Sequence, residues 1–126
     1  NRLQHALSRE AFSMVDQGIC TPEDIDKAVR FGFGFRYIAA GPAMQRDHAG
    51  IEIHAAGGAK IYPTLNNSPH VAKCVSERVA SGKFGMKTGE GFFPWTAETM
   101  KVERERYQEA LRAGLKIIQK DLPQIK

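Results

Sequence analysis

Apolar residues recur along most of this chain at steps of three and four, the spacing of one face of an α-helix. The first such stripe consists of Leu3, Leu7, Ala11 and Met14, and Gly18 follows it at the place of a left-handed C-cap. No stretch alternates between polar and apolar residues in the manner of a strand. The pattern therefore predicts an all-α protein whose first helix ends near Gly18.

Residues typical of helix N-termini divide the rest of the chain into further predicted helices. Thr21 and Pro22 suit an N-cap and a first helical position, and the helix that they begin is expected to stop at Gly32 and Gly34. Residues 31–37 then form an aromatic loop. The sequence predicts a second, short helix between two glycine-marked ends.

The middle of the chain is read as four shorter helices. One begins at Gly41-Pro42 and breaks near Gly50, and a second piece continues to Gly57-Gly58. A further helix covers Lys60 to Leu65, and Ser68-Pro69 is expected to cap and begin the next.

A long last helix is predicted after Thr96, which can cap it. Its apolar face comprises Met100, Tyr107, Leu111, Leu115, Ile118 and Leu122, and Pro123 closes it. Together these segments predict a helical bundle of about seven helices. Residues 1–126 are expected to form a single helical domain, with residues 96–126 as an extra C-terminal helix on a core of residues 1–95.

Composition changes this picture little. The 18 basic and 14 acidic residues are interspersed, and no Lys/Arg block favours nucleic acid. The nearly apolar stretch from Tyr37 to Met44 is too short to cross a membrane. The two cysteines, Cys20 and Cys74, have no metal-like spacing and are expected to be reduced thiols in a cytoplasmic protein.

No complete active site is visible in the residues themselves. Gly32-Phe33-Gly34 lacks the third glycine of a dinucleotide fingerprint, and Met86 stands where a P-loop needs glycine, although the amides of that loop could approach an anion. The four histidines form no ligand motif, so no metal site is expected. Three carboxylates that flank apolar runs favour structural acceptors over general bases: Glu10, Asp47 and Glu52.

Four ordered motifs resemble the C-terminal domain of 3-hydroxyacyl-CoA dehydrogenases over residues 1 to about 95. They are Asn1-Arg2-Leu3, the segment from Gly18 to Gly34, the segment from Gly41-Pro42 to Ile51-Glu52, and Lys83 to Phe93. In this family an upstream Rossmann domain binds NAD and supplies the catalytic His-Glu pair, and the helical domain faces the substrate and forms most of the dimer interface. The resemblance implies a homodimer that uses NAD when intact. No NAD is expected to bind to this chain alone, because the upstream domain is absent from it.

Two residues are candidates for a substrate site. The resemblance places Asn1 at an asparagine beside the substrate and the catalytic histidine, a role that needs the intact enzyme. Arg36 lies in an insertion, Phe35 to Ala40, that is similar to the branch containing lambda-crystallin, gulonate dehydrogenase and carnitine dehydrogenase. Those enzymes oxidise small hydroxy acids, so Arg36 is either a bidentate carboxylate clamp or a structural arginine of the loop or dimer.

Three interpretations of function stay open. The first is the substrate and dimerisation half of an NAD-dependent oxidoreductase that oxidises the 3-hydroxyl of an acyl-CoA in fatty-acid or related metabolism. The second makes the substrate a small free hydroxy acid. The third, from another class, is a non-catalytic helical dimerisation module.

Overall fold

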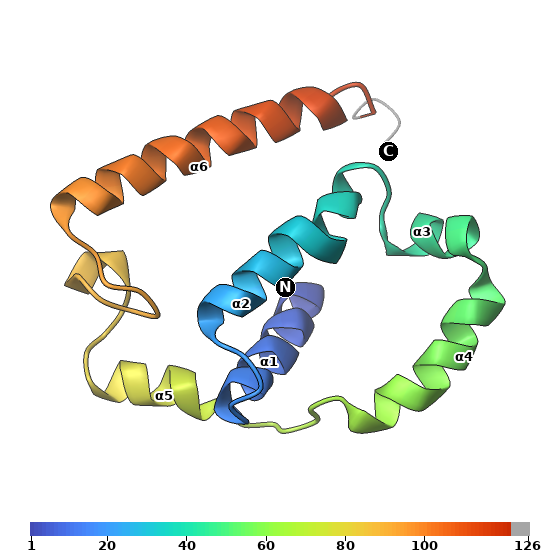
Figure 1. Cartoon of the computed structure of the whole chain (residues 1–126), viewed down its shortest axis with the longest axis horizontal. Helices are drawn as coiled ribbons and strands as arrows, with labels where there is room; N and C mark the ends of the chain where they lie inside the picture. Colours follow the sequence, from blue (N-terminus) through green and yellow to red (C-terminus); the bar gives the residue numbers. More distant parts are fainter. Residues whose placement is uncertain (122–126) are drawn as a thin grey trace. The chain divides into compact units, whose positions relative to one another are not determined.

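The computed structural model describes residues 1–121, and in this part of the chain the protein is all-α, as predicted (Figure 1). The α-helices are α1 (Arg2–Asp16), α2 (Pro22–Lys27), α3 (Pro42–Ala49), α4 (Ile51–Ile61), α5 (Lys73–Ala80) and α6 (Ala97–Ile118). Shorter turns of π- and 3₁₀-helix are η1 (Ala28–Phe33), η2 (Gly34–Ile38), η3 (Tyr62–Thr64) and η4 (Met86–Thr88). The only β-type pairings among the described residues are the isolated bridges of Glu90 with Gly85 and with Pro94.

The chain divides into two units, Asn1–Ser81 and the segment from Gly82 onward. The first unit contains α1 to α5, and the second contains the glycine-rich loop and α6. None of the described helices combines the length and the apolar character that crossing a bilayer requires.

In the first unit, α1 is held against α5 by side chains that cap backbone groups. The Asp16 carboxylate accepts hydrogen bonds from the Lys73 and Cys74 amides, at 2.6 and 2.7 Å. One turn earlier, Glu10 accepts from the Asn66 amide at 2.6 Å, and the Asn66 side chain donates to Ser13 Oγ at 2.8 Å. These bonds fix residues 66–74 along the C-terminal half of α1.

Little of the first unit is fully buried. Ala11, Ser13 and Cys74 lie where α1 meets α5, and Gly58 is covered by the ring of Tyr62. Most of the large apolar side chains in this unit remain exposed. The unit therefore has a small core beside a large uncovered apolar surface.

The predicted ends of α1 and α2 are confirmed. Gly18 has a φ of +69°, and its amide donates to the Val15 carbonyl, so it closes α1 in the left-handed conformation. Thr21 forms a capping box with Asp24, in which each side chain accepts the other residue's backbone N–H.

The predicted interruption of the helix at Gly32 is confirmed, whereas the predicted aromatic loop over residues 31–37 is wrong. The chain continues as η1 and η2, with a non-helical residue only at Gly32 (φ −96°, ψ −116°). At Gly34 a Cβ atom would collide with the Val29 carbonyl oxygen, so glycine allows a close turn to continue. Gly32 therefore interrupts the helix at a kink, and Gly34 allows the chain to resume as the 3₁₀ turn η2.

The helix break at Gly50 is confirmed, with a φ of +101° between α3 and α4. Gly57 and Gly58 do not end α4, which runs through to Ile61 and continues as the turn η3. The predicted helix from Lys60 to Leu65 is therefore the end of α4 and not a separate element. This merger leaves six α-helices among the described residues where about seven were predicted.

The predicted start at Ser68-Pro69 is also wrong, because α5 begins at Lys73. Ser68 instead accepts the His70 amide in a local turn, and its own amide donates to Asn66. The first amides of α5 are satisfied by Asp16, which is more than fifty residues away in the sequence. A cap that comes from so distant a residue cannot be recognised from the local sequence.

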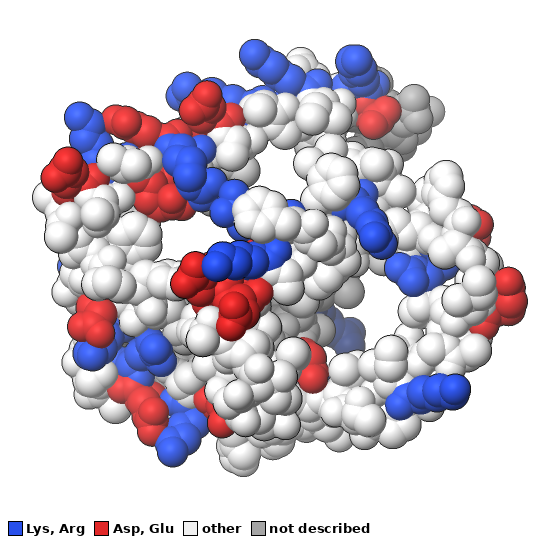
Figure 2. All heavy atoms as spheres, viewed as in Figure 1, with Lys and Arg blue, Asp and Glu red and all other residues white. Residues whose placement is uncertain are grey.

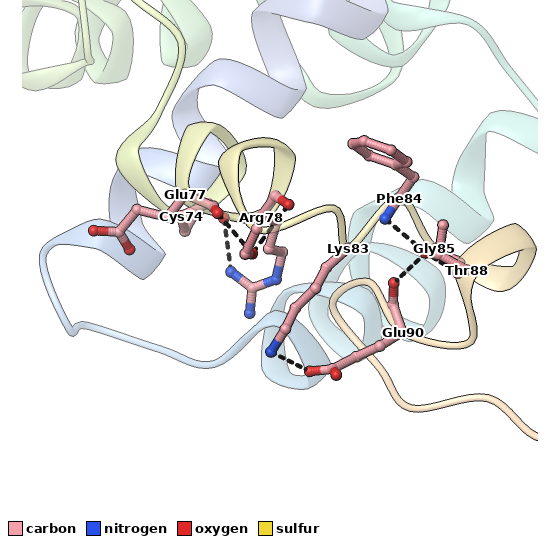
Figure 3. A network of polar contacts seen from close by, with 9 residues as sticks. Cys74, Glu77, Arg78, Lys83, Phe84, Gly85, Thr88 and Glu90 are labelled. Atoms are coloured by element: carbon pink, nitrogen blue, oxygen red, sulfur yellow. Dashed lines mark hydrogen bonds and ion pairs between the residues drawn. The ribbon is translucent and has the colours of Figure 1, made fainter.

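In the second unit, the loop from Gly82 to Gly91 folds back on itself (Figure 3). Thr88 Oγ1 accepts the Phe84 amide at 2.8 Å, and the Lys83 ammonium lies 2.7 Å from the Glu90 carboxylate. Gly91 approaches Gly85 so closely that a Cβ at residue 91 would lie 2.7 Å from the Gly85 Cα. Glycine is required at residue 91 by this contact.

The predicted cap of the last helix is confirmed, because Thr96 caps α6 in a box with Thr99. Tyr107, Leu111 and Leu115, from its predicted apolar face, are exposed. Leu122 and Pro123 lie outside the described residues.

Candidate functional site

Asn1 stands at the head of α1. Its carbonyl accepts the His5 amide at 2.9 Å, which is the first bond of the helix. Its side chain makes no capping bond and is exposed. The amide is therefore available to a ligand, and the role that the resemblance implies for it stays a prediction.

Arg36 lies in the middle of η2, on an element that was expected to be an irregular loop. The Ala39 and Ala40 amides both donate to the Arg36 carbonyl, so its backbone is fixed. The guanidinium is exposed and has no hydrogen bond or ion pair with any residue of the described part, 1–121. This observation removes one alternative, an arginine that ties together carbonyls of its own loop.

Aromatic residues flank Arg36 in the sequence and contact one another or a neighbouring arginine. Phe33 and Tyr37 meet edge to face with ring centroids 6.3 Å apart, and the Arg30 guanidinium lies over the ring of Phe31 at 5.0 Å. No described contact joins Arg36 to Asn1, so the two predicted site residues are separate features of the first unit.

A groove beside α1 was missed by the sequence analysis. It has a volume of about 760 Å³ and lies between the N-terminal half of α1 and residues 68–75. Arg2, His5 and Arg9 line it from α1. Their spacing of three and four places them on one helix face, and this periodicity was the signal that could have revealed a basic stripe.

The glycine-rich loop uses several of its amides for its own hydrogen bonds, and an anion site at its other amides stays a prediction. The amides of Phe84, Gly85, Thr88 and Gly89 each donate to an acceptor within the loop, and the Gly91 amide donates to the Phe93 carbonyl just after it. With these donors used internally, the loop is a structural hairpin.

The two thiols differ in their surroundings. Burial first, and then the neighbouring Asp16 carboxylate, raise the pKa of Cys74 to about 11. A thiol with so high a pKa is a poor nucleophile at neutral pH, which agrees with the structural interpretation of this cysteine. Cys20 is half-buried and free.

The histidines do not gather into a ligand set, and residues 1–121 contain no cluster of three or more potential metal-ligating side chains. His54 instead bridges two helices. Its Nδ1 lies 3.4 Å from an Arg46 guanidinium nitrogen, and its Nε2 lies 3.1 Å from the Tyr62 hydroxyl. This chain of contacts supports the angle between α3 and α4 across Gly50.

The face shown in Figure 2 has no surface of one charge sign that would favour nucleic acid. In Figure 2, basic and acidic side chains are interspersed over the visible face. Ion pairs such as Lys27 with Glu23 and Arg106 with Glu103 account for part of this mixture.

Comparison with known proteins confirms the resemblance that the four motifs indicated. Residues 1–95 match the profile of the 3-hydroxyacyl-CoA dehydrogenase C-terminal domain. A 5-formyl-3-hydroxy-2-methylpyridine 4-carboxylate 5-dehydrogenase of Mesorhizobium japonicum is 38% identical over 115 residues, which cover 89% of this chain and 37% of that protein. An L-carnitine dehydrogenase of Oceanobacillus iheyensis is 43% identical over 58 residues, which cover 46% of this chain and 17% of that protein.

A solved structure agrees with these relatives. The crystal structure of a 5-formyl-3-hydroxy-2-methylpyridine 4-carboxylic acid 5-dehydrogenase, an NAD⁺-dependent dismutase, superposes with a TM-score of 0.86 at 35% identity. The match covers 93% of this chain and 38% of that one. The chain thus spans less than two-fifths of the length of these relatives, and it belongs to the family of 3-hydroxyacyl-CoA dehydrogenase C-terminal domains.

Proposed function

We propose that this chain is the substrate-facing and dimer-forming domain of an NAD-dependent oxidoreductase that acts on a small free carboxylic acid. The observation that carries the proposal is the relative from Mesorhizobium japonicum, whose similarity extends over 89% of the chain. By its name, that protein acts on a pyridine carboxylate. The L-carnitine dehydrogenase likewise acts on a small molecule with a free carboxylate.

NAD would be held by another part of the intact protein. The described residues contain no strand followed by a glycine-rich turn and a helix, the unit that binds a dinucleotide. A bound NAD would supply the acceptor for a hydride from the substrate carbon, and a base elsewhere in the intact protein would take the proton of the substrate hydroxyl group. This chain would contribute the Asn1 amide and the surface that orients the substrate.

Arg36 is proposed to hold the substrate carboxylate. Its guanidinium is exposed and unpaired within residues 1–121, and two backbone hydrogen bonds fix the residue that carries it. A guanidinium can donate two parallel hydrogen bonds to one carboxylate, which aligns the substrate as well as attracting it. Arg36 would thereby select free acids over thioesters.

A substrate comparison tests the proposal. The intact protein is incubated with NAD and, in turn, with small hydroxy acids, pyridine carboxylates that bear a hydroxymethyl or formyl group, and 3-hydroxybutyryl-CoA. NADH formation should be faster with free acids than with the thioester. A higher kcat/KM for the thioester would exclude the free-acid proposal.

The second candidate function is oxidation of a 3-hydroxyacyl-CoA, which is favoured by the family to which residues 1–95 belong. The same experiment distinguishes it. Turnover of neither class of substrate would leave the third interpretation, a non-catalytic dimerisation module.

The partner that we propose, besides the NAD-binding domain, is a second copy of the chain. Phe31 and Phe35 are 70% and 63% exposed, and the adjacent Phe33, Tyr37 and Ile38 are also exposed. So large an apolar patch on one short segment is typical of an interface. The proposed dimer surface is therefore residues 31–38.

A further inference from the structure

The groove between α1 and residues 68–75 has no part in the function proposed above. Its volume of about 760 Å³ is within the range of small-molecule sites. Phe12, Val71 and Val75 give it an apolar lining. A ligand that fits this lining has an apolar body.

The charged groups of the groove are all of one sign. Arg2 and Arg9 are seven residues apart on α1, which places them two turns apart, about 10 Å along the helix. Neither guanidinium has an ion pair or hydrogen bond within residues 1–121. His5 and His70 add two imidazoles, and none of the described residues that line the groove is acidic. This arrangement favours an anion.

The walls of the groove are set before a ligand arrives. Asn66 and Asp16 attach residues 66–74 to the C-terminal half of α1 through four hydrogen bonds of 2.6–2.8 Å. The N-terminal half of α1 has no such attachment, so the two segments diverge and leave space between them. A preformed site loses less conformational freedom on binding.

From these three observations we infer that the groove binds a small amphipathic organic anion, with an apolar body and a carboxylate or phosphate group. The apolar body lies against Phe12 and the two valines, and Arg9 or Arg2 holds the anionic group. The inference is independent of Arg36, because no described contact joins that residue to the groove.

The test is a titration of the intact protein with benzoate, phenyl phosphate and the neutral analogue benzyl alcohol, followed by saturation-transfer NMR. Both anions should bind, and benzyl alcohol should bind at least about tenfold more weakly, because charged hydrogen bonds are the stronger ones. Arg9→Gln should raise the dissociation constant of benzoate about tenfold. Arg104→Gln, which removes an exposed arginine of α6, is the matched control and should change it less than about twofold.

Three results would overturn the inference. Equal binding of benzyl alcohol and benzoate would show that charge plays no part. A loss of binding in Arg36→Gln but not in Arg9→Gln would place the anion at the proposed substrate clamp. Absence of any binding to the intact protein would show that another domain or a second copy fills the groove. Failure of the free-acid proposal, in contrast, would appear only in the comparison of substrate turnover and not in this binding titration.

Discussion

Arg36 and Asn1 share one property at the scale of single residues. Each has a backbone fixed by hydrogen bonds and a polar side chain that the rest of the described chain leaves uncompensated. Fixing the backbone restricts where the polar group can lie, while exposure keeps the group available. This combination suits residues that contact a substrate. It also means that either residue can be substituted without disturbing the core.

Arg36→Lys in the intact protein should lower kcat/KM for a free acid by one to two orders of magnitude, about 1.5–3 kcal/mol. A lysine keeps the charge but cannot form the two parallel hydrogen bonds. The loss with an acyl-CoA should be much smaller, because the thioester end carries no charge. Arg30→Lys, in the same segment, is the control. Equal losses on both substrate classes would make Arg36 a structural residue.

Cys74 should resist alkylation. With a pKa of about 11, only about 0.1% of this thiol is ionised near pH 8, whereas a thiol in an unfolded chain has a pKa of about 8.5. In a Cys20→Ser variant, iodoacetamide should therefore react roughly 100-fold faster in denaturant than in buffer. Mass spectrometry over time measures both rates. Similar rates would show that Cys74 is not buried in the folded protein.

At the scale of elements, α5 depends on α1 for its first turn. The two amides that Asp16 accepts belong to the first residues of α5, so a side chain at the end of one helix caps another. Desolvation alone would raise the pKa of Asp16, but the hydrogen bonds from Cys74 and Lys73 outweigh it and lower the pKa below its ordinary value. The carboxylate is thus the form that the fold stabilises.

Asp16→Asn should destabilise the protein by about 1 kcal/mol at neutral pH, because the amide keeps one oxygen acceptor and loses the second acceptor and the charge. Because the folded state lowers the pKa of Asp16, its contribution is present above the ordinary pKa of an aspartate and is lost as the pH falls below it. The difference in Tm between variant and wild type should therefore shrink below about pH 4. Asp26→Asn, an exposed aspartate of α2, is the control. A difference independent of pH would contradict this assignment.

How far the sequence could predict the elements depends on the range of the interactions that define them. Gly18, Thr21 and Thr96 act on neighbours within a few residues, and all three predicted ends are confirmed. Ser68 was wrongly chosen as a cap because the true cap, Asp16, comes from a distant part of the chain. The basic groove was missed for the same reason, since its second wall comes from residues 68–75.

At the scale of the molecule, the first unit leaves most of its large apolar side chains exposed. Only a few of its residues are buried, and the aromatic segment 31–38 is open. The relatives are more than twice as long as this chain. Both facts are consistent with a domain whose surfaces are completed by other polypeptide.

The chain should form dimers in solution. Light scattering over a range of concentrations should give a mass near twice the 14.0 kDa of one chain, because pairing covers the exposed rings of residues 31–38. Phe31→Glu combined with Phe35→Glu should shift the mass toward the monomer, and Val102→Glu on α6 should not. A mass of one chain at every concentration would exclude the dimer.

The chain alone should not bind NAD. Titration with NADH, followed by its fluorescence, should show no saturation in the micromolar range, because the described residues include no phosphate-binding turn after a strand. The intact protein under the same conditions is the positive comparison. Micromolar affinity of the isolated chain would mean that it contains a nucleotide site of a kind not found in Rossmann domains.

The capping box at Thr96 has a consequence for the design of chimeras. The family match ends at residue 95, and the next residue, Thr96, is the N-cap of α6, with a capping box that Thr96 forms with Thr99. Because these capping bonds lie within the box itself, the start of α6 does not depend on the sequence that precedes Thr96. Chimeras between members of the family are therefore best joined between Trp95 and Thr96.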